Sequence, residues 1–121
     1  MRRCPTVCQL SRSSEPWRCV VSLHFVADEG GNAQQPPLEF GDPIFEKALV
    51  TERIRRAQCA ILNPGTPSLQ FLEASPEALE KRQLSFSSSS VCLEIYGRDV
   101  DDLSFVDLPG EKYRCRNLAT D

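Results

Sequence analysis

"VCLEIYGRDVDDLSFVDLPG", residues 91–110, contains two apolar runs separated by a polar turn, and this arrangement predicts two successive β-strands. The first run, 91–97, is rich in residues that favour strands and is closed by a glycine. The second run, 103–110, is also apolar but ends in an aspartate, a proline and a glycine. A strand suited to burial therefore delivers a carboxylate and a flexible backbone position at its end.

Asp107 and Gly110 have the chemistry of a phosphate and magnesium site. In α/β sheets the ligand crevice lies beyond the carboxyl ends of the strands. A carboxylate there commonly holds Mg²⁺ through a water, because Mg²⁺ loses its hydration shell reluctantly. A glycine three residues later lets a backbone N–H approach a terminal phosphate without a Cβ in the way. D-x-x-G by itself is equally typical of an ordinary strand-to-turn transition, so both interpretations stay open at this point.

The N-terminal part of the chain predicts two more strands. Residues 17–26 alternate between two faces, which is the period of a strand with at least one buried face. Residues 4–10 are a weaker strand candidate, and residues 11–16 supply the turn between them. We expect these two strands to form an antiparallel pair.

One main helix is expected after the loop 28–43. Asp42 can cap it, and Pro43 suits its first position because the missing N–H would be unpaired there. The helix should cover much of 43–62, pack on the sheet and end at Asn63-Pro64-Gly65. Its apolar stripe consists of Val50, Ile54, Ala57 and Ile61.

A short second helix can begin at Ser75 and run through Arg82, by the same cap and first-turn logic. The order strand, strand, helix, strand, strand predicts a fragment of an α/β domain.

The overall composition excludes several classes of protein. With 121 residues the chain is about one domain long, and 26% charged with 40% hydrophobic residues is typical of a globular chain. The net charge of −3 argues against a nucleic-acid partner, because such domains carry a basic excess. Arg53, Arg55 and Arg56 cluster, but Glu46 and Glu52 lie among them, so we interpret this segment as a solvated helix face.

The sequence predicts a cytoplasmic protein. Arg2 and Arg3 resemble the basic start of a signal peptide, yet no apolar segment of about 7 to 15 residues follows them. No run approaches the roughly 18 apolar residues of a membrane span.

The six cysteines and the single histidine do not predict a metal site or a catalytic site. The spacing of the cysteines fits neither a zinc motif nor a disulfide framework, so we expect small buried apolar side chains in a reducing compartment. His24 falls on the more polar face of its strand, without a neighbouring acid or nucleophile, and is expected to be a surface histidine.

Four stretches in order resemble the GTPase domain of the dynamin-like large GTPases. "RCPTVCQL" (3–10) is similar to the strand after switch I, and "EPWRCVVSLHF" (15–25) to its antiparallel partner. "ERIRRAQCAILNP" (52–64) resembles the family's helix and its exit. The most specific match is 84–110, which ends in the family's D-L-P-G motif. The resemblance implies an incomplete P-loop GTPase-type mixed sheet, an α/β fold with an antiparallel strand pair and one main helix.

The same resemblance implies a partial G domain over 3–110, with GTP and Mg²⁺ as ligands. Asp107 corresponds to the acid that assists Mg²⁺ binding through a water, and Gly110 to the glycine whose backbone senses the γ-phosphate. Leu108 and Pro109 shape the turn into switch II. Residues 111–121 are unlike the family and are expected to form a divergent tail.

The departures from the family pattern bear on activity. No G-x-x-x-x-G-K-[ST] loop occurs, Arg2 stands where the family has the switch I threonine, and the guanine-reading T-K-x-D motif is absent. We therefore expect a chain that neither holds nor hydrolyses GTP by itself, with no catalytic residue of its own. The alternative is a non-catalytic interaction module that binds itself or a related dynamin-like GTPase through an unpaired sheet edge. A membrane would be reached only through a full-length relative.

Overall fold

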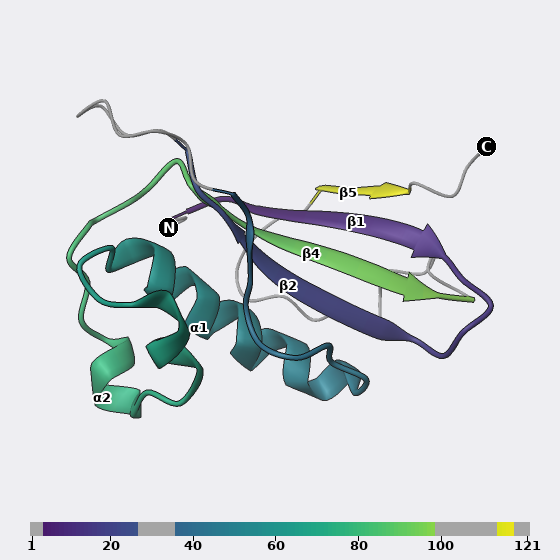
Figure 1. The fold of residues 1–121 in the computed structure, drawn as a ribbon, viewed down its shortest axis with the longest axis horizontal. Helices are drawn as coiled ribbons and strands as arrows, with labels where there is room; N and C mark the ends of the chain where they lie inside the picture. Colours follow the sequence, from purple (N-terminus) through teal and green to yellow (C-terminus); the bar gives the residue numbers. More distant parts are fainter. Residues whose placement is uncertain (1–3, 27–35, 99–113, 118–121) are drawn as a thin grey trace.

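The computed structural model describes residues 4–26, 36–98 and 114–117 and contains a mixed five-stranded sheet with one main helix packed on it (Figure 1). The elements in chain order are β1 (Thr6–Arg12), β2 (Arg18–His24), β3 (Leu38–Glu39), η1 (Lys47–Leu49), α1 (Val50–Leu62), η2 (Ser68–Leu72), α2 (Pro76–Leu79), β4 (Ser90–Gly97) and β5 (Arg114–Asn117).

The strands lie in the order β3-β2-β4-β1-β5, with β4 at the centre. β4 runs parallel to β1, where Arg12 lies opposite Gly97, and antiparallel to β2, where Arg18 lies opposite Tyr96. β5 extends the sheet parallel to β1, and β3 extends it antiparallel to β2. The α/β fold class is confirmed at this level, as a small mixed sheet with one main helix.

The predicted pairing of the first two strands is wrong, because β4 lies between them. β1 and β2 have opposite directions, yet each pairs with β4 and not with the other. The cause is the apolar character of β4, whose Val91, Leu93 and Ile95 are fully buried. A local hairpin of β1 and β2 would leave this apolar strand at a sheet edge, whereas the central position covers it on both sides.

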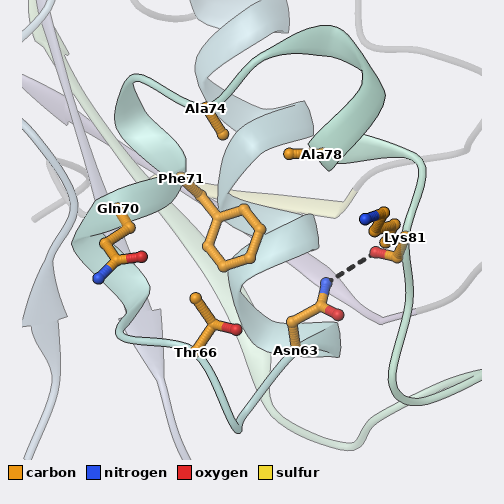
Figure 2. Close-up of a pocket in the computed structure, with 7 residues that line it drawn as sticks. All are labelled: Asn63, Thr66, Gln70, Phe71, Ala74, Ala78 and Lys81. Carbon is orange, nitrogen blue, oxygen red and sulfur yellow. Dashed lines mark hydrogen bonds between the residues drawn. The ribbon is translucent and has the colours of Figure 1, made fainter.

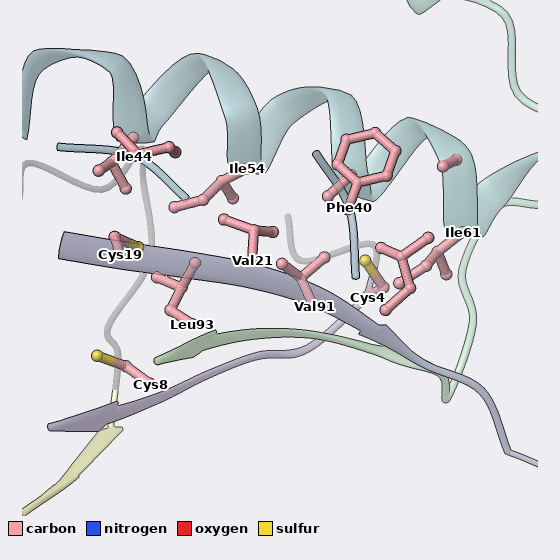
Figure 3. Packing of buried hydrophobic residues seen from close by; sticks show 14 of the residues in the cluster. Cys4, Cys8, Cys19, Val21, Phe40, Ile44, Ile54, Ile61, Val91 and Leu93 are labelled. Carbon is pink, nitrogen blue, oxygen red and sulfur yellow. The ribbon is translucent and has the colours of Figure 1, made fainter. Parts of the chain in front are cut away.

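The core lies between α1 and one face of the sheet. The apolar stripe of α1 is confirmed, because all four of its predicted members are buried. Figure 3 shows Ile54 and Ile61 pointing from the helix toward Val21 and Val91 of the strands. Full burial of one such side chain contributes about 1.5–3 kcal/mol. The same sheet face contributes Cys8, Leu10, Cys19, Leu23, Leu93 and Ile95 to the cluster.

The predicted start of the helix is wrong, because helical structure begins only at Lys47. Ile44, buried under the helix, exchanges two backbone hydrogen bonds of 2.8 Å with Cys19 of β2. Asp42 therefore lies in a bend and Pro43 is the irregular residue before Ile44, and neither begins a helix. The predicted end is confirmed, with Leu62 as the last helical residue and Asn63 as its C-cap.

The other connections differ from the expectation in detail. β3 lies inside the segment predicted as a loop, and Phe40 after it donates to the carbonyl of Val21 at 2.8 Å. Ser75 caps α2 as predicted, but this helix ends at Leu79 and not at Arg82. β5 lies within the predicted tail, while the predicted strand 103–110 lies outside the described residues.

Two of the clustered arginines are not a solvated face, because they hold backbone carbonyls of neighbouring segments. Arg53 Nη1 donates to Asp42 at 2.9 Å and to Phe40 at 3.2 Å. Arg56 Nη1 donates to three carbonyls, those of Phe71, Leu72 and Ala74. The prediction holds for Arg55, whose side chain is 47% exposed beside Glu52. Arg53 and Arg56 thus fasten two neighbouring segments to α1, beside its apolar stripe.

Candidate functional site

The residues predicted to hold Mg²⁺ and phosphate, Asp107, Leu108, Pro109 and Gly110, lie outside the described residues. Among the residues that the structure describes, hollows lie at the end of β4, between α1 and η2, and beside the C-terminal half of α1.

The first hollow lies at the carboxyl ends of the parallel strands β1 and β4. Because β4 separates β1 from β2, the connection between them passes over the end of β4 (Figure 1). Ser13 N donates to the carbonyl of Gly97 at 2.8 Å, and Arg98 Nε donates to the carbonyl of Ser14 at 3.0 Å. The carboxyl ends of parallel strands are where open α/β sheets bind ligands.

The hollow has a volume of about 360 Å³, and we call it the β4-end pocket. Its lining consists of Glu15, Pro16, Trp17, Lys47 and Arg98.

Lys47 reaches this pocket through the pairing of Ile44 with Cys19. That pairing brings η1 beside the start of β2, so that Lys47 Nζ lies 5.8 Å from the centroid of the Trp17 ring. A cation at this distance from an indole is attracted by the ring face, by about 0.5–1 kcal/mol at an exposed site. The pocket combines a flat apolar wall with positive charge.

Sequence reasoning missed this pocket. In the sequence, Trp17 is one of the alternating residues of a predicted strand, and Lys47 follows Glu46 in a segment of mixed charge. Neither pattern indicates a pocket. The one available signal was Arg98, a cation directly after a strand that ends in glycine. The meeting of the three residues depends on the crossing connection and on the pairing of Ile44, neither of which has a local sequence pattern.

The second hollow, of about 320 Å³, lies between the end of α1, η2 and α2, with the Phe71 ring at its base (Figure 2). The side-chain amide of Asn63, which lines this hollow, is already hydrogen-bonded. Its Nδ2 donates to the carbonyls of Cys59 at 2.7 Å and Lys81 at 2.9 Å. Asn63 Oδ1 accepts from Gln83 N at 2.9 Å. Asn63 therefore joins α1 to the segment after α2, and its role is structural.

The third hollow, of about 220 Å³, is lined by Arg55, Gln58, Arg82 and the Cys59 thiol among others. Cys59 Sγ donates to the carbonyl of Leu79 at 3.1 Å. Burial raises the pKa of Cys59, and the nearby positive charges of Arg82 and Arg55 only partly oppose this. A protonated, buried thiol is a poor nucleophile, so this cavity is not a cysteine active site.

The cysteines whose side chains the structure describes are buried, as predicted. Burial raises the pKa of Cys4 to about 11 and that of Cys19 to about 12. No group of three His, Cys, Asp or Glu residues that could hold a metal occurs among residues 4–26 and 36–98. The five cysteines whose side chains are described, all buried, are Cys4, Cys8, Cys19, Cys59 and Cys92.

The sheet face opposite α1 carries a polar network. Arg18 Cζ lies 4.2 Å from the centroid of the Tyr96 ring, and Tyr96 Oη donates to Glu94 Oε2 at 2.8 Å. That hydrogen bond is the main cause that raises the pKa of Tyr96, and burial adds to it. His24 lies half-buried at the end of β2, as expected for a histidine near the surface.

In comparisons with known proteins, no protein-family model, curated protein or solved structure matches this chain. Among the described helices, none has both the length and the apolar character needed to cross a membrane.

Proposed function

We propose that the chain is part of a dynamin-like GTPase domain, an incomplete P-loop GTPase-type fold that covers residues 3–110. One observation supports the proposal: the stretches that resemble the family include, in chain order, residues of β1, β2, α1 and β4. Residues 3–10 end within β1, 15–25 contain β2, 52–64 contain most of α1 and its C-cap, and 84–110 begin with the segment that becomes β4.

The GTP and Mg²⁺ that the resemblance implies do not fit the described residues. No phosphate-binding loop occurs in the sequence, and residues 4–26 and 36–98 contain no group of residues that could hold a metal. Asp107 would assist Mg²⁺ and Gly110 would contact the terminal phosphate. Both roles need a phosphate-binding loop and a switch I threonine, which this sequence lacks. Phosphoryl transfer depends on positioning by the whole site, so the chain alone is proposed to be inactive.

The genomic reading frame on both sides of the coding segment tests the family assignment. We expect an in-frame G-x-x-x-x-G-K-[ST] upstream, and downstream a stretch that encodes the switch II continuation that residues 111–121 do not resemble. Genomic sequence that encodes neither would overturn the assignment to a GTPase domain.

A titration with fluorescent GTP tests the inactivity of the chain alone. We expect no Mg²⁺-dependent binding and no release of phosphate. Micromolar binding that requires Mg²⁺ and that Asp107→Ala abolishes would show that the chain holds nucleotide without the missing loop. Asp42→Ala is the matched control, because it removes an exposed aspartate outside the D-L-P-G motif.

A second candidate function, an interaction module, is favoured by exposed apolar side chains beside the helix. Phe45 is 65% exposed and Leu49 52% exposed, and both belong to the approach to α1. Exposed apolar groups near one another are typical of association surfaces. Self-association, measured by light scattering after size exclusion, should be lost in Phe45→Asp and kept in Glu46→Asp. A wild-type chain that is monomeric at all concentrations argues against association with itself.

Residence in the cytoplasm, with access to membranes only through a full-length relative, is part of the same proposal and follows from the family resemblance.

A further inference from the structure

We propose that Ser85 is a phosphorylation site for a protein kinase that selects basic substrates. The inference goes beyond the proposed function and does not rest on it, because no residue of the D-L-P-G motif takes part. It rests on the charge pattern before Ser85, on the exposure of this segment between α2 and β4, and on the hydrogen bonds of the neighbouring hydroxyl groups.

The sequence around Ser85 has the pattern of such a substrate. Residues 81–86 read KRQLSF, so that Arg82 lies three positions before the serine and Phe86 directly after it. Kinases of this class recognise an arginine at this spacing through carboxylates of their own cleft, and they favour an apolar residue after the serine. The serines at 87–90 have no cation three positions before them.

The same spacing occurs once more in the sequence, where Arg3 precedes Thr6 by three positions. The structure separates the two candidates. Thr6 is the first residue of β1, lies opposite Val91 of β4, and its Oγ1 accepts from Gln58 Nε2 at 3.3 Å. A kinase could reach this hydroxyl only after β1 had left the centre of the sheet.

The segment that carries Ser85 is accessible instead. Arg82 and Ser85 are exposed, and the Phe86 side chain is 73% exposed. Residues 81–89 contain neither helix nor strand. A kinase cleft takes up its substrate as a locally open chain, and a surface segment without regular structure reaches that form at lower cost than a paired strand.

The Ser85 hydroxyl is available for reaction, whereas two of the hydroxyls after it are engaged. Ser85 has no hydrogen-bond partner among residues 4–26 and 36–98. Ser87 Oγ accepts from Ser89 N at 3.0 Å, and Ser89 Oγ accepts from Val26 N at 3.1 Å. Ser89 is also buried, at 8% exposure. Accessibility thus favours the same serine as the charge pattern.

The reaction joins Ser85 Oγ to the γ-phosphorus of ATP. The bond from that phosphorus to the oxygen it shares with the β-phosphate breaks, ADP leaves, and the catalytic aspartate of the kinase accepts the hydroxyl proton. The product carries about −1.5 to −2 charges at pH 7 between Leu84 and Phe86, two exposed apolar side chains. Phosphorylation therefore changes an apolar stretch of the surface into an anionic one.

The test incubates the folded full chain with Mg²⁺-ATP and the catalytic subunit of the cAMP-dependent protein kinase, and locates the phosphate by mass spectrometry of peptides. Synthetic peptides of residues 1–11 and 79–90 are the unfolded references, and we expect the kinase to modify both. In the folded chain we expect phosphate on Ser85 and at least about tenfold less on Thr6. No phosphate on Ser85, or a preference for Thr6 or for the serines at 87–90, would overturn the proposal.

The rate relative to the peptide tests the accessibility of Ser85. Gln83 N donates to Asn63 Oδ1 and Leu84 N to the carbonyl of Leu62, both at 2.9 Å, and these two bonds have to open in the kinase cleft. The folded chain should therefore react up to about a hundredfold more slowly than the peptide of residues 79–90. A reaction slower by about a thousandfold or more would contradict an accessible site.

Substitutions assign the recognition to Arg82. Arg82→Gln should lower kcat/KM for Ser85 by about tenfold or more, the loss of one charge-assisted contact with the kinase. Arg55→Gln is the matched control, because it removes another exposed arginine outside the segment. Ser85→Ala should remove the phosphate, and Ser88→Ala, at an exposed serine of the same segment, should leave it in place. An unaltered rate in Arg82→Gln, or equal loss in Arg55→Gln, contradicts the proposal.

Discussion

Arg56 Nη1 donates to the carbonyl oxygen of Ala74 at 2.8 Å, across 18 positions of the sequence. The same nitrogen also lies within hydrogen-bond distance of the carbonyls of Phe71 and Leu72. Phe71 and Leu72 are the last residues of η2 and Ala74 lies in the connection to α2, so this one guanidinium joins α1 to both. A residue that sequence patterning assigns to a solvated face is thus a clamp between α1 and the segment that follows it.

Arg56→Met should lower the free energy of unfolding by about 2 kcal/mol, because a charged donor to three partly buried carbonyls is lost. Methionine retains most of the aliphatic volume, so the change isolates the guanidinium. Arg55→Met is the matched control, since the Arg55 side chain is 47% exposed and that of Arg56 only 20%. Urea unfolding measures both, and equal stability losses in the two variants would contradict the clamp.

Gly41→Ala should also destabilise the fold, by about 1–3 kcal/mol. Gly41 has φ +88°, a region that alanine adopts only with strain, and an added Cβ would lie 2.9 Å from Arg53 Cζ. The Arg53 guanidinium would have to leave the carbonyls of Phe40 and Asp42. Gly65→Ala is the comparison, because its Cβ would meet only the flexible end of Gln83. Thermal unfolding should rank Gly41→Ala well below Gly65→Ala.

Tyr96→Phe should cost about 1 kcal/mol at neutral pH, because it removes the hydrogen bond to Glu94 and leaves the ring under Arg18. The hydrogen bond requires the protonated phenol, and the pKa of Tyr96 is raised by it. Its contribution is therefore complete below the ordinary tyrosine pKa and disappears as the pH rises through the raised value. The difference between wild type and Tyr96→Phe in urea unfolding should be constant from neutral pH upward until that range and vanish above it.

Local patterns predicted what depends on local contacts. The stripe of α1 and the end of the helix at Asn63 could be predicted, because a period of four and three residues and a proline act within one segment. Strand pairing could not be predicted, because β1 and β2 both pair with β4, and each residue of β1 pairs with one 85 positions later, as Thr6 does with Val91.

For the candidate site, too, local patterns could be interpreted from the sequence and long-range contacts could not. Asp107 and Gly110 stay a prediction, since they lie outside the described residues. The β4-end pocket could not be predicted, because the contact between Trp17 and Lys47 depends on the pairing of Ile44 with Cys19. A contact between two segments that are far apart in the sequence carries no local signature in either of them.

Alkaline pH should destabilise the fold through its buried thiols. Burial raises the pKa of Cys19 from 9.0 to about 12 and that of Cys4 from 9.0 to about 11. Because the folded-state pKa lies above the unfolded one, the unfolded chain loses its thiol protons first. The stabilisation is complete below pH 9.0 and is lost as the pH rises toward 11 for Cys4 and 12 for Cys19. The slope should approach about 1.4 kcal/mol per pH unit for each thiol.

Cys19→Ala separates this effect from the general cost of alkaline conditions. The variant should be less stable than the wild type at neutral pH, because a buried side chain is truncated, but its stability should fall less steeply above pH 9.0. Urea unfolding at several pH values measures both slopes. The Cys19 thiol should react with a soluble disulfide reagent only at the rate at which the fold opens, because the side chain is fully buried against Ile44 and the helix. Identical pH slopes for wild type and Cys19→Ala, or fast reaction of Cys19 in the folded chain, would contradict a buried, protonated thiol.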